Sequence, residues 1–145
     1  LLDCGGYPVR LALELLGDTA KVVYSKLEQP EGFEVDLYGS AVMENEAGQV
    51  AQISFGMDNA YQCQLEVWGS EVTLIAPRIF TAGDGVIPTL ILRSSTDEQK
   101  LELAVDDQFL HSIEVFEQAI QAAGSGCTAD WALQKQIELV DKIRW

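Results

Sequence analysis

The chain has 145 residues and a mass of 15.9 kDa, which is long enough for one hydrophobic core but too short for two domains of usual size. Acidic residues outnumber basic ones by 23 to 9, which gives a formal net charge of −14, and no basic cluster interrupts this excess. This charge excludes nucleic acids and anionic membrane surfaces as expected partners.

The first predicted element is a short, mostly buried helix over residues 7–16. Pro8 suits its first turn and Gly17 suits the position after its last residue. The glycines in Cys4-Gly5-Gly6 allow the backbone to turn sharply just before this helix. Its apolar residues fall at positions 9, 11, 12, 13, 15 and 16.

Consecutive β-strands are expected through the middle of the chain. These segments are rich in β-branched, aromatic and alternating apolar residues, and short turns separate them. The connections are too short for parallel crossovers, so the strands should pair antiparallel. The predicted strands cover residues 20–28, 35–45, 49–56, 61–68, 71–76, 87–93 and 99–105.

Two helices are expected at the end of the chain, separated by a break at Gly124-Ser125-Gly126. Thr128 or Asp130 can cap the second helix. The apolar face predicted for the helix over 107–123 consists of Phe109, Leu110, Ile113, Phe116, Ala119, Ile120 and Ala123. The face predicted for the last helix consists of Trp131, Leu133, Ile137, Val140 and Ile143.

This order of elements predicts a single α+β domain over residues 1–145. Its open, predominantly antiparallel sheet should carry helices packed on one face. The strands hold apolar residues on both alternating sets, so the second face should be covered by a partner.

Several classes of site are missing from the sequence. It contains no G-x-G-x-x-G, Walker or G-x-S-x-G motif, and its single histidine, His111, cannot anchor a His-based metal site. Gly83-Asp84-Gly85 reads as a turn. The three cysteines form no C-x-x-C pair, which indicates thiols without a catalytic or metal-binding role in a reducing compartment. A cytoplasmic protein without a membrane segment or signal peptide is therefore expected.

The opening stretch holds the side chains best suited to catalysis. Asp3 and Tyr7 lie four positions apart, and Tyr7 falls at the N-terminus of the predicted helix. There the positive end of the helix dipole would stabilise a developing phenolate, so Tyr7 could exchange a proton with a carbonyl or carbinol oxygen. Asp3 would then orient Tyr7 or bind a substrate hydroxyl. The structural alternative is a tyrosine packed at the start of a core helix.

The stretch Leu1-Leu2-Asp3-Cys4-Gly5-Gly6-Tyr7-Pro8-Val9-Arg10 resembles the start of the C-terminal domain in the glucose–fructose oxidoreductase/inositol dehydrogenase/rhizopine-catabolism (Gfo/Idh/MocA) family. That domain opens with a D-[VI]-G-x-[HY] motif, from which this chain departs at Cys4. The segment 66–71 resembles the family's G-[ST]-[ED]-G turn, with Val72 where the last glycine is usual. Weaker similarity extends over residues 41–55, 113–120 and 132–144.

The resemblance implies that the chain is a fragment that follows a dinucleotide-binding domain. Tyr7 would be the acid/base of an NAD(P)-dependent oxidoreductase acting on a sugar, sugar nucleotide or related polyol. Asp3 would be its active-site neighbour, and Arg10 would face the substrate. NAD or NADP would bind to the N-terminal domain and not to this fragment, which should be inactive alone.

The resemblance also implies a homo-oligomer that associates through the open sheet face. A second hypothesis remains open, in which the chain is a non-catalytic binding or assembly module of the same fold within a larger multidomain protein. The residues upstream of this chain would separate the two.

Overall fold

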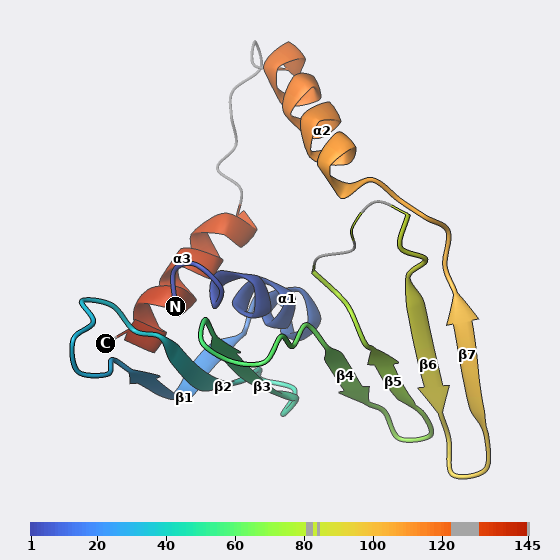
Figure 1. Ribbon diagram of the computed structural model, residues 1–145, viewed down its shortest axis with the longest axis horizontal. Coiled ribbons are helices and arrows are strands. Elements are labelled where there is room, and N and C mark those ends of the chain that lie inside the picture. The colour runs from blue at the N-terminus through green and yellow to red at the C-terminus, as the bar shows by residue number, and fades with distance from the viewer. Residues whose placement is uncertain (81–82, 84, 123–130, 145) are drawn as a thin grey trace. The chain divides into compact units, whose positions relative to one another are not determined.

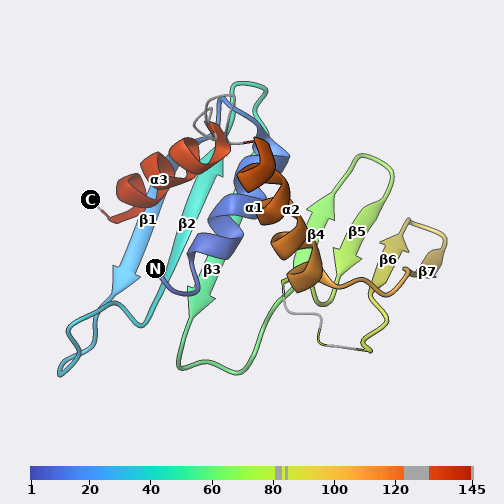
Figure 2. The ribbon, with the colours of Figure 1, turned by 90° about the horizontal axis from the view of Figure 1, so that it is seen from above.

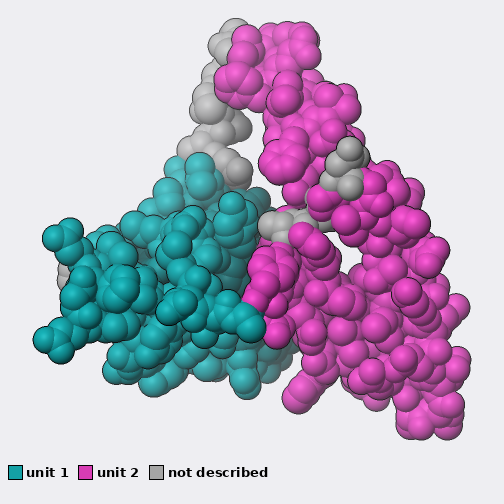
Figure 3. Space-filling model, in the orientation of Figure 1, with its two compact units in different colours: residues 1–60, 128–145 teal, residues 61–127 magenta. Residues whose placement is uncertain are grey.

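The computed structural model describes residues 1–80, 83, 85–122 and 131–144 (Figure 1). The chain divides into two compact units, shown in teal and magenta in Figure 3. Unit 1 comprises Leu1–Ala60 and Thr128–Trp145, and unit 2 comprises Tyr61–Cys127. The predicted helix break at 124–126, the candidate caps Thr128 and Asp130, and Cys127 lie outside the described residues, as does Asp84 of the predicted turn.

Unit 1 is built on a three-stranded antiparallel sheet in the order β1-β2-β3. Its strands are β1 (Lys21–Glu28), β2 (Tyr38–Glu44) and β3 (Val50–Gly56). The pairing of β2 with β3 is regular from end to end, whereas β1 shifts its register against β2 between Val22 and Tyr24. Such a bulge adds twist to the strand that carries it.

Helices α1 (Gly6–Leu16) and α3 (Trp131–Arg144) lie over one face of this sheet, as Figure 2 shows. The helices and the facing strand positions form the hydrophobic core of unit 1. The largest fully buried side chains in that core are Leu13, Met43, Leu139 and Val9. Because side chains alternate along a strand, the residues on either side of Met43 in β2 point to the opposite face.

The start and end of α1 are close to those predicted. Gly17 ends the helix with φ at 77°, a conformation that glycine adopts readily, and its N–H donates to Leu13 O at 2.9 Å. The last helix carbonyl, that of Leu16, accepts a hydrogen bond from Asn45 Nδ2 at 2.8 Å. The buried side chain of Asn45 thereby connects the end of α1 to the turn between β2 and β3.

The face that α3 turns toward the core matches the predicted one only in part: Ile143 is buried and Val140 packs against the core, as predicted. Trp131, Leu133 and Ile137 are exposed, and the buried residues are Ala132, Leu139 and Ile143. The helix carries apolar residues on two sides, and Gln136 interrupts the side that packs. A count of apolar residues alone therefore places Trp131, Leu133 and Ile137 on the packed side incorrectly.

Unit 2 contains a four-stranded antiparallel sheet in the order β4-β5-β6-β7. Its strands are β4 (Leu65–Trp68), β5 (Thr73–Ala76), β6 (Thr89–Arg93) and β7 (Glu98–Glu102). The predicted strand over 61–68 is shorter than expected, because its first four residues are not part of the sheet. Helix α2 (Gln108–Ala122) follows the last strand.

The predicted apolar stripe of α2 does not pack into a core of the described residues. Phe109 is 71% exposed and Phe116 is 67% exposed, and Ile113 and Ile120 are exposed as well. The 3.6-residue periodicity correctly predicts the helix. Periodicity does not show what covers the apolar side.

The structure confirms the α+β class and the open, antiparallel sheet structure. The strands divide into two sheets, not the one sheet that their order suggested. The division falls at residues 57–64, which lie between β3 and β4 and belong to neither sheet. Strand periodicity predicts which segments extend, but a change of sheet within a longer connection leaves no periodic signal.

Candidate active site

The residues before α1 form a tight turn. The N–H of Gly5 donates to Leu1 O at 2.8 Å, and Gly5 is so close to Leu1 that an added Cβ would lie 2.8 Å from the same oxygen. Gly5 is the N-cap of α1 and offers no side chain to its free N–H groups. The glycine pair therefore produces the sharp entry into the helix that the sequence suggested.

Tyr7 is the second residue of α1 and is 60% exposed. The first-turn N–H groups of a helix have no intrahelical acceptors, and they carry the positive end of the helix dipole. The exposed ring contradicts the alternative of a tyrosine buried in the core. Its position at the positive end of the dipole would favour negative charge on a nearby oxygen.

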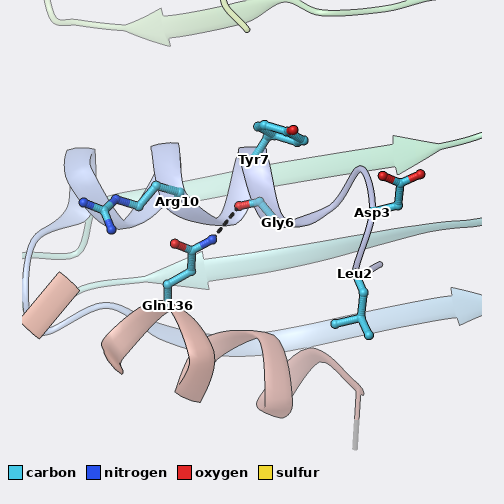
Figure 4. A pocket seen from close by; sticks show the side chains of 6 residues that line it. All are labelled: Leu2, Asp3, Gly6, Tyr7, Arg10 and Gln136. Carbon is cyan, nitrogen blue, oxygen red and sulfur yellow. Dashed lines mark hydrogen bonds between the residues drawn. The ribbon is translucent and has the colours of Figure 1, made fainter. Parts of the chain in front are cut away.

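A shallow depression of about 310 Å³ surrounds this helix start. Figure 4 shows the Tyr7 ring projecting from the first turn of α1, the Asp3 carboxylate on the segment that leads into the helix, and Gln136 reaching Gly6 from α3. The predicted site residues Asp3, Tyr7 and Arg10 thus line one hollow. Its full lining is Leu2, Asp3, Gly6, Tyr7, Arg10 and Gln136.

The two charged residues of the hollow differ in their surroundings. Asp3 is exposed, and its carboxylate makes no hydrogen bond or ion pair with the described part of the chain. Arg10 donates from Nε to Glu14 Oε1 at 2.8 Å, one turn further along α1. A guanidinium has five N–H donors, so this pair leaves others for a ligand. The hollow can therefore both accept and donate hydrogen bonds.

Gln136 is the lining residue that sequence reasoning missed. Its Nε2 donates to Gly6 O at 3.0 Å, which joins positions 130 residues apart in the chain. The signal in the sequence was weak. Gln136 lies at helical spacing from the buried residues Ala132, Leu139 and Ile143, so a polar residue interrupts a packed stripe.

Other kinds of site find little support in the described ranges, 1–80, 83, 85–122 and 131–144. They contain no group of three or more His, Cys, Asp or Glu side chains arranged to hold a metal ion. No helix within these ranges has the length and apolar character required to cross a membrane. Cys4 is half-buried, and Cys63 is buried, where its Sγ accepts a hydrogen bond from the Phe80 N–H at 3.2 Å.

Unit 2 has its own hollow, of about 200 Å³. Arg78, Asp106 and Gln108 supply its charged and amide groups, and its other lining side chains are mainly apolar. The guanidinium of Arg78 also lies over the ring of Tyr61, 5.6 Å from its centroid. No residue in this hollow combines exposure, a helix terminus and an ionisable hydroxyl as Tyr7 does.

Residues 1–75, just over half of the chain, match the family model described as the GFO/IDH/MocA C-terminal domain. The chain belongs to the Gfo/Idh/MocA family. The match includes the opening turn, α1 and the whole sheet of unit 1, and so contains most of the lining of the Tyr7 hollow.

Individual Gfo/Idh/MocA relatives are similar over almost the entire chain. A dTDP-3,4-didehydro-2,6-dideoxy-α-D-glucose 3-reductase of Streptomyces violaceoruber is 34% identical over 99% of this chain and 45% of its own length. The enzyme of the same name from Actinomadura kijaniata is 32% identical over 99% of this chain and 43% of its length. The chain thus spans less than half the length of these relatives.

The same similarity appears in three dimensions. KijD10, a 3-ketoreductase from Actinomadura kijaniata, has been solved in complex with TDP-benzene and NADP. The chain matches that structure with a TM-score of 0.91 and 32% identity, over 99% of this chain and 44% of KijD10.

Proposed function

We propose that this chain is the substrate-binding domain of an NADP-dependent ketoreductase that acts on a nucleotide-linked deoxysugar, with Tyr7 as its proton donor. The observation that carries the proposal is the exposed Tyr7 at the N-terminus of α1, in a chain that 3-ketoreductases match over 99% of its residues.

The chain's own residues would handle the substrate and the proton. As negative charge develops on the ketone oxygen, the Tyr7 hydroxyl would donate its proton there and leave a carbinol. The N-terminus of α1 would stabilise the phenolate that remains. Asp3 would accept a hydrogen bond from a sugar hydroxyl, and Arg10 would donate to a substrate oxygen with an N–H group that Glu14 does not use.

The dinucleotide would bind outside this chain. The sequence contains no glycine-rich loop of the type that cradles a pyrophosphate, so its residues do not fit that cofactor. The reduced cofactor, NADPH, would supply the hydride for the ketone carbon when bound to a partner domain. The proposal therefore includes an N-terminal dinucleotide-binding domain as partner. A reducing compartment such as the cytoplasm suits a chain whose three cysteines form no C-x-x-C pair.

We also propose that a second copy of the chain covers the open face of the β1-β2-β3 sheet. The register places Tyr24 opposite Val42 on β2, and Tyr38 lies on the same side of β2 as Val42. Tyr24 and Tyr38 are exposed there, while α1 and α3 occupy the other face. Two such faces packed together would bury this apolar surface.

Oxidation of NADPH by the complete protein tests the proposed activity. A nucleotide-linked 3-ketodeoxysugar should support turnover, and the free sugar without its nucleotide should support little. A chain that acts only as a binding module would bind the sugar nucleotide in calorimetry without oxidising NADPH. That result would favour the second hypothesis.

A further inference from the structure

The carbonyl of Gly6 is held by a side chain from the other end of unit 1. Gln136 Nε2 donates to it at 3.0 Å, and Figure 4 shows the amide bridging α3 and the first turn of α1. Gln136 is half-buried on a helix face whose other members, Ala132, Leu139 and Ile143, are buried and apolar. A polar side chain on that face indicates a role for its hydrogen bond.

The atom that Gln136 holds belongs to the peptide unit of Tyr7. The Gly6 carbonyl and the Tyr7 N–H are parts of one planar group that also includes the Tyr7 Cα. Fixing the carbonyl oxygen therefore fixes the plane from which the Tyr7 side chain departs. The effect of Gln136 on Tyr7 needs no contact between the two side chains.

Gly5 and Gly6 restrain this peptide through the backbone alone. Gly5 and Gly6 lack side chains, and Gly5 makes no side-chain capping bond to the helix. Glycine has the widest range of backbone conformations, so a Gly-Gly entry permits Tyr7 to reorient with its helix turn. A hydrogen bond from α3, which packs on the sheet through Leu139 and Ile143, adds a side-chain restraint to the backbone hydrogen bonds of α1.

We propose that Gln136 is the positioning residue for Tyr7: by holding the Gly6–Tyr7 peptide it keeps the phenol aimed at the reacting oxygen. This inference rests on the proposed function, in which Tyr7 donates the proton. A proton donor must lie within hydrogen-bond reach of its acceptor, and small misplacements of catalytic groups are costly.

A double-mutant cycle in the complete enzyme tests the inference. Gln136→Met keeps the length and volume of the side chain and removes the donor. It should lower kcat about tenfold while the KM for the ketosugar stays within about twofold. Gln134→Met changes an exposed glutamine of the same helix and should leave both constants unchanged.

The same substitution is then made in a Tyr7→Phe background. If Gln136 acts through the Tyr7 hydroxyl, Gln136→Met should lower kcat there by less than about twofold. An equal tenfold loss in both backgrounds would show a merely structural effect and overturn the inference. So would an undiminished kcat in the single variant. Wild-type kcat in Tyr7→Phe itself would instead overturn the proposed function.

A direct readout is available because residues 6 and 7 form the only Gly–Tyr pair among the 145 residues. Glycine labelled with ¹³C at the carbonyl and tyrosine labelled with ¹⁵N give a peak from this peptide, which Gly6→Ala identifies by removing it. In Gln136→Met the Gly6 carbonyl resonance should move upfield as its donor is lost. An unmoved resonance would overturn the inference.

Discussion

Gly5 and Gly6 are adjacent in the sequence, yet their surroundings differ at the scale of single atoms. A Cβ on Gly5 would lie 2.8 Å from Leu1 O and 2.9 Å from Leu1 Cδ1, inside a buried turn. A Cβ on Gly6 would meet Gln136 Nε2 at 3.8 Å, which is ordinary contact. The requirement for glycine is therefore steric at Gly5 and weak at Gly6.

Alanine substitutions at the two positions should have opposite effects on the free energy of unfolding. Gly5→Ala should destabilise the protein by about 1–3 kcal/mol, because backbone atoms cannot move aside cheaply. Gly6→Ala should stabilise it by about 0.5 kcal/mol, because alanine lowers the conformational entropy of the unfolded chain and its Cβ meets no clash in the folded one. Urea denaturation of both variants checks this. Equal losses would show that both glycines are needed for the turn.

Removal of one oxygen atom tests the role of Tyr7. Tyr7→Phe in the complete enzyme should lower kcat by about 10²-fold, as expected for loss of a general acid, while the ring keeps its packing. Tyr38→Phe, at an exposed tyrosine on β2, is the matched control and should keep its kcat. Steady-state oxidation of NADPH measures both. Comparable kcat values for the two variants would contradict the assignment.

At the scale of elements, the end of α1 depends on the turn between β2 and β3. Asn45 is buried and donates from Nδ2 to Leu16 O at 2.8 Å and to Gln49 Oε1 at 2.8 Å. Its Oδ1 accepts from the Gln49 N–H at 3.0 Å. The side chain thus satisfies a terminal carbonyl of the helix and closes the hairpin turn at once.

Asn45→Ala should lower the free energy of unfolding by about 1–3 kcal/mol, because Leu16 O loses its donor in a buried place. Gln49→Ala removes only the exposed partner and should cost less than about 1 kcal/mol. Thermal or urea denaturation distinguishes the two. If Gln49→Ala lowers the free energy of unfolding as much as Asn45→Ala does, the stabilisation comes from the turn and not from the hydrogen bond to α1.

At the scale of the whole molecule, a single chain leaves much apolar surface without cover. The stripe on α2 is exposed, and so are the aromatic residues on the outer face of the β1-β2-β3 sheet. Monomers rarely expose large contiguous apolar patches, so such surfaces indicate association. A chain that spans less than half of its relatives' length also leaves room for another domain as the partner of some of this surface.

A charge at the centre of the outer sheet face should disrupt self-association. Light scattering should give a dimer or larger assembly for the wild type and a monomer for Val42→Asp, because the buried carboxylate would lack a partner. Val35→Asp, at an exposed position before β2, should leave the assembly intact. A wild-type mass near 15.9 kDa at high micromolar concentration would contradict the prediction.

The 145-residue chain alone should not bind NADP in the micromolar range. It has no glycine-rich loop between a strand and a helix, which is the element that gives a pyrophosphate its backbone N–H groups. Isothermal titration calorimetry with the isolated chain measures this, and the complete protein serves as positive control. Micromolar binding by the isolated chain would mean that it holds a dinucleotide site of a different kind.

Local chemistry in the sequence was sufficient to determine the elements, the α+β class and the position of Tyr7. Pro8 lies in the first turn of α1 and Gly17 ends it, and alternating apolar residues identify the strands, because these signals act over a few neighbouring residues. The family resemblance rested on such a local motif, residues 1–10, and the match over residues 1–75 confirms it. The substrate roles of Asp3 and Arg10 remain predictions.

Only the tertiary structure decided which surfaces meet. It divided the strands between two sheets, turned Ala132, Leu139 and Ile143 of α3 inward, and left the stripe of α2 exposed. It also brought Gln136 to Gly6 across 130 residues of sequence. Such choices depend on the packing of distant segments, where several faces of similar hydrophobicity compete and the differences in free energy are small.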